Sequence, residues 1–331
     1  MNVTPLRTCL IINPTAGKKA GLTTNASGLE DIRALLERHE IDAEILCTEH
    51  AGHGTELAQQ AVRDGYELVI AAGGDGTVAE VAEGLVASNA VLGVLPLGSV
   101  MNVARMLGLP RDLDQAAEVI KTRRIARIDV GRARSQAKTA FFMEAAGVGI
   151  DAGLFAYFNQ LDRGNWRTLK PLFNFMWRYR PRRVTVRLDG QPRRYRALMV
   201  TVANGPYLGA ALTLAPDAQL DDHQFDVQIF TGFGKFELVR HLLAIAGGRR
   251  VYNPKVLSFR ARTVEIEPRK PMMAHADSQP LGTTPARFDV VPAALAVIVG
   301  GEEGCLPALM YQPEPAAECE DAVPEVEAAA S

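Results

Sequence analysis

Short apolar runs alternate with amphipathic helical patterns over about the first hundred residues, and this alternation restricts the fold more than any other feature. The runs and the helical patterns between them cover residues 8–13, 29–40, 43–47, 54–65, 67–74, 77–88 and 91–98. Strands separated by helices form βαβ units, whose parallel sheet is buried between two layers of helices. The sequence therefore predicts a Rossmann-like parallel α/β domain at the N-terminus.

Beyond about residue 128 the pattern changes to short alternating runs separated by Gly, Pro and Asp. These runs cover residues 182–190, 194–204, 225–230 and 263–268. Alternation of apolar and polar residues is typical of antiparallel sheets with one solvated face. We therefore expect a second domain, an antiparallel β-sandwich, with a helix pair within 152–179 and a further helix at 234–248.

Length and composition agree with two domains. The chain has 331 residues, of which 47% are hydrophobic, and its net charge is -2. Residues 312–331 hold six acids and no base, so the rest of the chain carries about +4. Such an acidic segment without apolar periodicity is typical of disorder. The expected division is an α/β domain over 1–129, joined by 301–311, a β-rich domain over 130–300 and a disordered acidic tail over 312–331.

The spacing of the cysteines and the hydropathy of the chain indicate in which cellular compartment the protein is expected. The four cysteines form no CxxC pair, which favours reduced thiols. No apolar run reaches the length of a membrane span, and the N-terminal run is too short for a signal peptide. The expected location is the cytoplasm.

Three loops rich in glycine and small polar residues follow the predicted parallel strands. They are NPTAGKKAG at 13–21, GGDGT at 73–77 and PLGSVMN at 96–102. Ligands of open parallel sheets bind at the carboxyl ends of the strands, and glycine lets the backbone approach a phosphate at a helix N-terminus. A tight turn with Asp75 or Thr77 as a helix cap is the plainer interpretation of GGDGT. Neither GxxxxGK[ST] nor GxGxxG is present. Three such loops on one edge favour a polyphosphate site in which Asp75 acts near a cation or an acceptor hydroxyl.

The order of these motifs resembles the catalytic domain of the diacylglycerol kinase family, which includes sphingosine, ceramide and bacterial lipid kinases. The resemblance rests on INPTAG, GGDGT with Glu80, PLGSVMNVARMLGLP, AGVGIDA, ANGPYLGAALTLAPDAQLDDHQFDV and ADSQPLG with FDVVPAALAVIV. It runs from about residue 8 to residue 300. GGDGT alone also occurs in NAD kinases, whereas the later motifs favour the lipid kinases.

The resemblance implies transfer of the γ-phosphate of ATP, with Mg²⁺, to a lipid hydroxyl in the cleft between the two domains. Asp75 would be the most sensitive catalytic residue, and the lipid head would approach Asp151. The residues implied at the nucleotide are Asn13, Thr48, Gly74, Gly76, Thr77, Glu80 and Ser99. A structural Mg²⁺ loop is implied at Asp222 with the main-chain carbonyls of Gln219 and Gln224. His223 stands where that loop usually has glycine, so we expect a different bend.

Two other positions depart from the family pattern. GTGND is replaced by GSVMN at 98–102, so an acid becomes Asn102. Asp-Gly-Glu, whose glutamate is the base toward the lipid hydroxyl, is replaced by Asp277, Ser278 and Gln279. Because a general base contributes about 10²- to 10⁴-fold, slowed turnover is expected, with Asp277 or Asp75 taking the proton. The alternatives are a nucleotide- or lipid-binding regulatory pseudokinase on the same scaffold and an NAD kinase-like small-molecule kinase.

The remaining clusters concern partners. Eight arginines lie between Arg178 and Arg196. Strand alternation favours a solvated face, and contact with anionic lipid headgroups at the inner membrane surface is the second interpretation. Nucleic acid is not expected, because no RNA-recognition signature accompanies the arginines. His50 and His53 form HxxH, interpreted as a loop entering a helix in preference to a zinc site. The family resemblance also suggests a homodimer.

Overall fold

The structure is a computed structural model of the chain. It describes residues 6–14, 18–19, 22–23, 28–162, 165–208, 212–234, 237, 240, 244 and 253–300. Within these residues, no helix is both long enough and apolar enough to cross a membrane. The predicted helix at 234–248 falls almost wholly outside the described residues, as do the segment 301–311 and the acidic tail.

The N-terminal domain contains the predicted parallel sheet. Its strands run in the order β6 (Val91–Pro96), β5 (Leu68–Gly73), β1 (Thr8–Ile12) and β4 (Ala43–Cys47). All three neighbouring pairs are parallel. The helices around the sheet are α1 (Leu29–Arg38), α2 (His53–Arg63), α3 (Asp75–Leu85), α4 (Asn102–Met106) and α5 (Leu113–Thr122).

Alternate side chains of one strand enter two different cores, which confirms the expected helices on both faces of the sheet. Cys9 and Ile11 of β1 pack in the core that contains Ala58 of α2 and Val81 of α3. Leu10 and Ile12 of β1 pack in the core formed with α1 and α5. Because both faces are buried, the central strands β5 and β6 are apolar throughout, whereas the edge strand β4 carries the exposed Glu44. The central strands thus offer no polar side chains, and the loops that follow them supply those at the edge of the sheet.

The second domain is the predicted antiparallel β-sandwich. Its main strands are β8 (Thr139–Phe142), β9 (Ala145–Gly149), β10 (Arg182–Leu188), β11 (Gln191–Ala203), β14 (Phe225–Thr231), β15 (Val256–Ala261), β16 (Thr263–Pro268), β17 (Met273–Ala276) and β18 (Gln279–Thr283). Alternate residues of β10, Val184, Val186 and Leu188, point into a common apolar core with Phe225 and Phe288. The period-2 pattern of the sequence thus describes this domain correctly.

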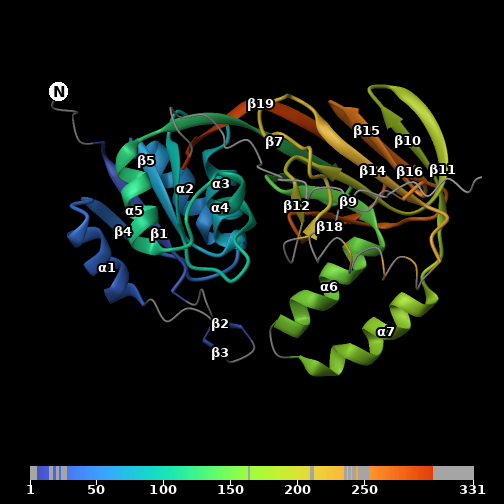
Figure 1. Ribbon diagram of the computed structural model, residues 1–331, viewed down its shortest axis with the longest axis horizontal. Helices are drawn as coiled ribbons and strands as arrows, with labels where there is room; N and C mark the ends of the chain where they lie inside the picture. The colour runs from blue at the N-terminus through green and yellow to red at the C-terminus, as the bar shows by residue number, and fades with distance from the viewer. Residues whose placement is uncertain are drawn as a thin grey trace, which may run out of the picture.

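Two long strands extend through both domains. β7 (Ile125–Ser135) and β19 (Ala286–Ile298) pair along most of their length, and the inner end of β19 also pairs in parallel with β6. Figure 1 shows both strands crossing the top of the molecule from one domain to the other. The expected boundary at residue 129 therefore falls inside β7, and the domains share a continuous sheet of 15 strands in the described part of the chain.

A helical pair projects from the second domain, as predicted for 152–179. It consists of α6 (Ile150–Asp162), the short helix η1 (Trp166–Thr168) and α7 (Leu169–Arg178), and Figure 1 shows the pair below the β-sandwich. Two small hairpins complete the described elements: β2 (Lys18–Lys19) with β3 (Leu22–Thr23), and β12 (Tyr207–Leu208) with β13 (Leu212–Thr213).

Candidate functional site

The loops after the parallel strands meet at the carboxyl edge of the sheet. Main-chain N–H groups just past each strand donate across this edge: Asn13 to Ala72 O at 3.1 Å, Thr48 to Ile12 O at 2.9 Å, and Leu97 to Gly73 O at 3.0 Å. The side-chain amide of Asn13 also lies 3.4 Å from the Thr77 hydroxyl. Asn13, Thr48 and Thr77, predicted at one site from three separate loops, therefore lie at one rim.

Glycine is required where two of these loops touch. A Cβ on Gly98 would lie 2.7 Å from the Gly74 Cα, and a Cβ on Gly73 would lie 2.5 Å from the Thr77 Cβ. A side chain at Gly98 would push the two loops apart, and one at Gly73 would displace Thr77 within its own loop. Gly76 faces the opposite situation, since nothing lies within 4 Å of the place where its Cβ would be. The loops are therefore closely packed at Gly73 and Gly98, whereas there is open space beside Gly76.

Asp75 is the first residue of α3 and does not cap that helix. The helix is capped by Gly74 without a side-chain hydrogen bond. The Asp75 Oδ1 accepts a hydrogen bond from the Val103 N–H at 3.1 Å, in the first turn of α4. The N–H groups of Gly76 and Thr77 lie in the first turn of α3, where the helix offers no acceptor and its dipole favours an anion. The interpretation of Asp75 as a simple helix cap is therefore wrong.

A buried acid that the sequence analysis missed lies beside this loop. Glu144 is 5% exposed, and its Oε2 accepts a hydrogen bond from the Asn102 side-chain amide at 2.7 Å. Asn102, 1% exposed, directly precedes the residue that donates to Asp75. The available signal was an acid inside the apolar run FFMEAAGVG at 141–149. Glu144 belongs to the second domain, so the two domains meet at this point.

Asp277 lies on the other side of Glu144, with its carboxylate held by main chain. Its Oδ2 accepts from Met143 N at 2.7 Å, and its Oδ1 accepts from Glu144 N at 2.9 Å and from Ala145 N at 3.1 Å. Burial raises the pKa of the Asp277 carboxyl to about 6, while these three donors and the nearby His275 lower it. Asp277 therefore fixes the chain that carries Glu144.

Gln279 follows a tight turn and is exposed. Asp277 and Ser278 have φ values of 43° and 63°, the left-handed pair typical of a type I′ turn between β17 and β18. Gln279 is the first residue of β18 and is exposed to solvent. The residue at the expected base position is thus an accessible amide beside a rigid turn.

Asp151 is buried at the start of α6 against a histidine. The His275 Nε2 lies 3.3 Å from the Asp151 Oδ2, and both side chains are at least 93% buried. A Cβ on Gly147 would lie within 3.0 Å of both groups, so glycine makes room for the pair. Burial and the charge of Asp151 raise the pKa of the Tyr179 hydroxyl. The residue predicted at the lipid head therefore lies in a buried polar cluster that the sequence analysis missed.

Two residues predicted at the nucleotide have other partners. The Glu80 carboxylate accepts from Gly52 N at 2.8 Å and from Gly54 N at 3.1 Å, at the N-terminus of α2. Ser99 is exposed, and its carbonyl accepts from the Arg111 guanidinium at 2.6 Å. Glu80 of α3 thus joins this helix to α2 beside the site. The same two helices also pack closely where Gly84 contacts Ala58.

The loop expected to hold a structural Mg²⁺ has a guanidinium beside its acid. The Asp222 Oδ1 accepts from Gln224 N at 3.0 Å, and the Arg260 Nη1 lies 3.3 Å from the Asp222 Oδ2. His223 has φ of 60° and donates its N–H to Asp129 at 2.6 Å. These contacts bend the loop and place a positive charge beside its acid, while the buried Asp222 Oδ2 has no hydrogen-bond partner within the described residues. The Mg²⁺ ion expected at Asp222 therefore stays a prediction. The carbonyl ligands expected from Gln219 and Gln224 remain a prediction.

The histidine motif forms a compact surface cluster. Ligand atoms of His50, His53 and Glu56 lie within 4.8 Å of one another. However, the His53 Nδ1 accepts a hydrogen bond from Glu49 N at 3.0 Å, which places the ring proton on Nε2. A metal ligand at Nε2 needs the other tautomer, so the local hydrogen bonding opposes a metal.

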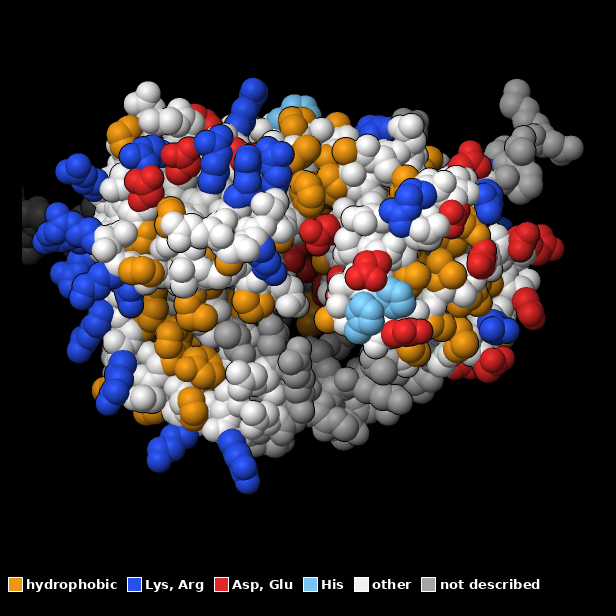
Figure 2. All heavy atoms as spheres, turned by 180° about the vertical axis from the view of Figure 1, so that it is seen from behind, with side chains coloured by type: hydrophobic (Ala, Val, Ile, Leu, Met, Phe, Trp, Pro, Cys, Tyr) orange, Lys and Arg blue, Asp and Glu red, His pale blue; other side chains and the backbone are white. Residues whose placement is uncertain are grey.

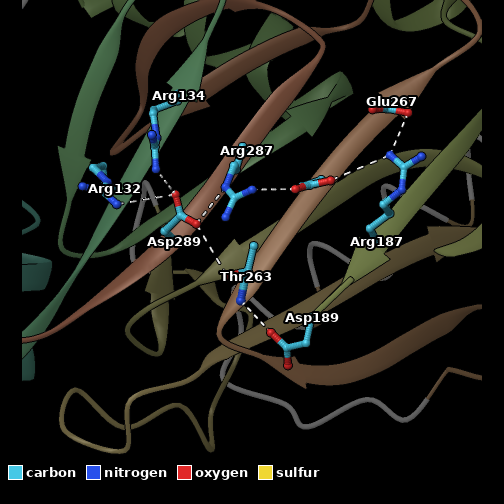
Figure 3. Close-up of polar contacts among 9 residues, drawn as sticks. Arg132, Arg134, Arg187, Asp189, Thr263, Glu267, Arg287 and Asp289 are labelled. Carbon is cyan, nitrogen blue, oxygen red and sulfur yellow. Dashed lines mark hydrogen bonds and ion pairs between the residues drawn. The ribbon is translucent and has the colours of Figure 1, made fainter. Parts of the chain in front are cut away.

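The arginine-rich segment between Arg178 and Arg196 includes the hairpin of β10 and β11, and one of its arginines takes part in a salt-bridge network within the sheet. Arg187 of β10 lies 2.8 Å from Glu267 of β16, and Figure 3 shows this pair joined through a neighbouring carboxylate to Arg287 and Asp289 of β19. Charges paired across strands in this way are typical of a solvated sheet face. In Figure 2, further Lys and Arg side chains gather over the outer end of the second domain, and acidic side chains lie in a hollow between the domains.

Comparison with known proteins agrees with this geometry. Residues 7–133 match the family model for the diacylglycerol kinase catalytic domain, and residues 146–299 match that for the YegS C-terminal NAD kinase beta sandwich-like domain. A diacylglycerol kinase of Staphylococcus haemolyticus is 28% identical over 301 residues, covering 86% of each chain. One of Bacillus subtilis is 28% identical over 293 residues, covering 85% of this chain and 92% of the relative.

Solved structures show the same fold. A crystal structure of a putative diacylglycerol kinase from Bacillus anthracis has a TM-score of 0.72 at 22% identity, covering 90% of this chain and 98% of that one. A second structure from that organism has a TM-score of 0.71 at 24% identity over the same shares. With both family models matched in order on the two domains described above, the chain belongs to the diacylglycerol kinase catalytic-domain family.

Proposed function

We propose that the protein is an ATP-dependent lipid kinase that transfers the γ-phosphate to a hydroxyl of diacylglycerol or a related lipid. The observation that carries this proposal is the meeting of Asp75, at an open glycine loop and helix N-terminus, with Glu144 and the Asp277 turn of the second domain. Phosphoryl transfer requires a phosphate-binding loop and acidic groups at one place, and this arrangement at the domain boundary supports the proposal.

The α/β domain would hold the nucleotide. The N–H groups of the first turn of α3 face the phosphates, and the open position at Gly76 lets the polyphosphate approach the main chain. When bound with ATP, Mg²⁺ neutralises phosphate charge. The α/β domain contributes the acid Asp75 at this edge. The hydrogen bond from the Val103 N–H holds the Asp75 carboxylate at the rim.

The second domain would hold the acceptor lipid. The Asp151 and His275 pair is a polar group beneath α6, and Phe155 of that helix packs against the imidazole ring with centroids 4.8 Å apart. A polar pair beside aromatic side chains suits a lipid with a hydroxylated head and an apolar tail. The helical pair α6 and α7 covers this region.

Helix α7 supplies the surface for contact with a membrane. Leu169, Phe173 and Trp177 recur every four residues and are 49%, 68% and 54% exposed. Lys170 and Arg178 lie on the same helix and are exposed. An exposed apolar stripe with flanking cations is typical of helices that lie in the interface of an anionic bilayer. This stripe, together with the exposed arginines up to Arg196, would bring the acceptor site to its substrate.

The test is transfer of radiolabelled γ-phosphate from ATP into a total lipid extract with Mg²⁺. We expect a labelled lipid with the wild-type protein and none with Asp75→Ala, which keeps the fold because Asp75 is partly exposed at the rim. Label that persists in the Asp75→Ala sample contradicts the assigned site. Label in a water-soluble acceptor, with none in lipid, favours an NAD kinase-like activity instead.

A regulatory binding protein is the second candidate, and one observation favours it. The expected base is the exposed amide Gln279, and the neighbouring Asp277 carboxylate accepts three main-chain hydrogen bonds. A pseudokinase of this kind predicts ATP binding by calorimetry without any labelled product.

A further inference from the structure

The orientation of Asp75 depends on α4, a helix of five residues. The Val103 N–H that binds the Asp75 Oδ1 lies at the start of this helix. The residue before the helix, Met101, has φ of 56° and is buried beside Gly98. A helix this short has little stability of its own, so its position must be set by its contacts.

One of these contacts comes from the second domain. The Asn102 amide donates to the Glu144 Oε2 at 2.7 Å, and both side chains are at least 95% buried. A hydrogen bond to a buried carboxylate is charge-assisted and stronger than a neutral one. The helix that orients Asp75 is therefore held at its first residue by an acid from the other side of the domain boundary.

Glu144 is itself held firmly by its main chain. Its N–H donates to the Asp277 Oδ1 at 2.9 Å. Its carbonyl accepts from Asn204 N at 3.0 Å and from Gly205 N at 2.9 Å. These bonds fix the two-residue connection between β8 and β9 to the β17–β18 turn and to the end of β11. Glu144 thus projects from a rigid frame in the lipid domain.

We infer that Glu144 is a positioning residue for phosphoryl transfer, which acts on Asp75 through Asn102 and the main chain of α4. This inference rests on the proposed function and adds to it a route by which the acceptor domain sets the geometry of the nucleotide domain. The route runs from the Asp277 turn, beside Gln279, through Glu144 to Asp75.

The first test replaces the hydrogen-bond acceptor. Glu144→Leu removes it and is expected to lower kcat for lipid phosphorylation about 10- to 100-fold, with the KM for ATP within about threefold of wild type, because small misplacements of a catalytic group have effects of this size. Glu144→Gln keeps an acceptor oxygen and is expected to be at least about tenfold more active than Glu144→Leu. The matched control is Glu267→Leu, which changes an exposed side chain of β16 and should leave kcat unchanged.

The decisive test is a double variant in which the acid at residue 144 is one methylene shorter and the amide at residue 102 is one methylene longer. Glu144→Asp shortens the acid, and Asn102→Gln lengthens the amide, so the double variant restores the reach of the bond. We expect Glu144→Asp to lose activity and the double variant to recover about tenfold or more of it, which is a coupling that independent sites do not show. Rates are measured well below the Tm of every variant, so loss of folded protein does not contribute.

The outcomes separate this inference from the proposed function. Wild-type transfer that is lost in Asp75→Ala but unchanged in Glu144→Leu overturns the positioning role and leaves the kinase proposal standing. A double variant no more active than Glu144→Asp also overturns it. A wild-type protein that labels no acceptor overturns the proposed function itself.

Discussion

Arg260 places its Nη1 3.3 Å from the Asp222 Oδ2, where the family resemblance leads one to expect a metal ion. Its Nε also lies 3.6 Å from Asp226. Burial raises the pKa of the Asp226 carboxyl, Arg260 lowers it, and the charges of Asp222 and Asp217 raise it again. Asp222 and Asp226 therefore share one guanidinium, whose single positive charge offsets part of the negative charge of the loop.

We predict that the stability of the wild-type protein does not depend on Mg²⁺. Its Tm should be the same in EDTA and in excess Mg²⁺. Arg260→Gln leaves Asp222 and Asp226 without their cation and should lower the free energy of unfolding by about 1 kcal/mol, a modest value because Arg260 is partly exposed. Added Mg²⁺ should then restore the Tm of this variant. The exposed Arg262→Gln serves as the control, and a wild-type Tm that falls in EDTA contradicts the prediction.

A second prediction concerns α7. Serine at Leu169, Phe173 and Trp177 together removes most of the exposed apolar stripe and should weaken binding to anionic vesicles about tenfold or more, since burial of each large apolar side chain contributes about 1.5–3 kcal/mol. Cosedimentation with vesicles of stated composition measures this. Kinase activity toward a short-chain lipid dispersed in detergent should change little. Equal vesicle binding by the triple variant and the wild type would show that the stripe is not the contact surface.

Gln279 provides a third prediction. If the exposed amide limits proton transfer, Gln279→Glu should raise kcat for lipid phosphorylation at least about tenfold, because a general base contributes about 10²- to 10⁴-fold. The increase should disappear at low pH, where the new carboxyl is protonated. Gln279→Ala is the control for loss of the side chain. A rate unchanged in Gln279→Glu excludes the amide as the limiting group.

The α/β domain and its glycine loops were predictable because the relevant signals are local. β-branched runs define strands such as β5, and the carboxyl ends of parallel strands necessarily meet at one edge. The close approach of Gly74 and Gly98 follows from that rule, although the two residues are 24 positions apart. Alternation likewise predicted the sandwich strand β10.

The features that sequence reasoning missed depend on long-range pairing. Glu144 finds Asn102 across 42 residues, and no motif marks either residue as a partner of the other. The hydrogen bonds of the Glu80 carboxylate with Gly52 and Gly54 likewise join residues that are 28 and 26 positions apart, and the expected place of Glu80 at the nucleotide stays a prediction. Periodicity also does not reveal that β7 and β19 pair across both domains, because that depends on which strands become neighbours.

The last prediction concerns stability and pH. His39 is buried between two acids of α5: its Nε2 lies 2.9 Å from Asp114, and its Nδ1 lies 2.8 Å from Glu118. The hydrogen bond to Asp114 is the largest cause of a raised His39 pKa, with burial opposing it and Glu118 adding to it. Because the folded state favours the imidazolium, its contribution is fully present below the unfolded pKa of about 6.5 and is lost as pH rises through the raised folded value. His39→Asn should therefore lower the Tm more at pH 6 than at pH 9. The control His50→Asn, at an exposed histidine, should show no such difference between the two pH values. A decrease in Tm from His39→Asn that is equal at pH 6 and pH 9 contradicts this assignment.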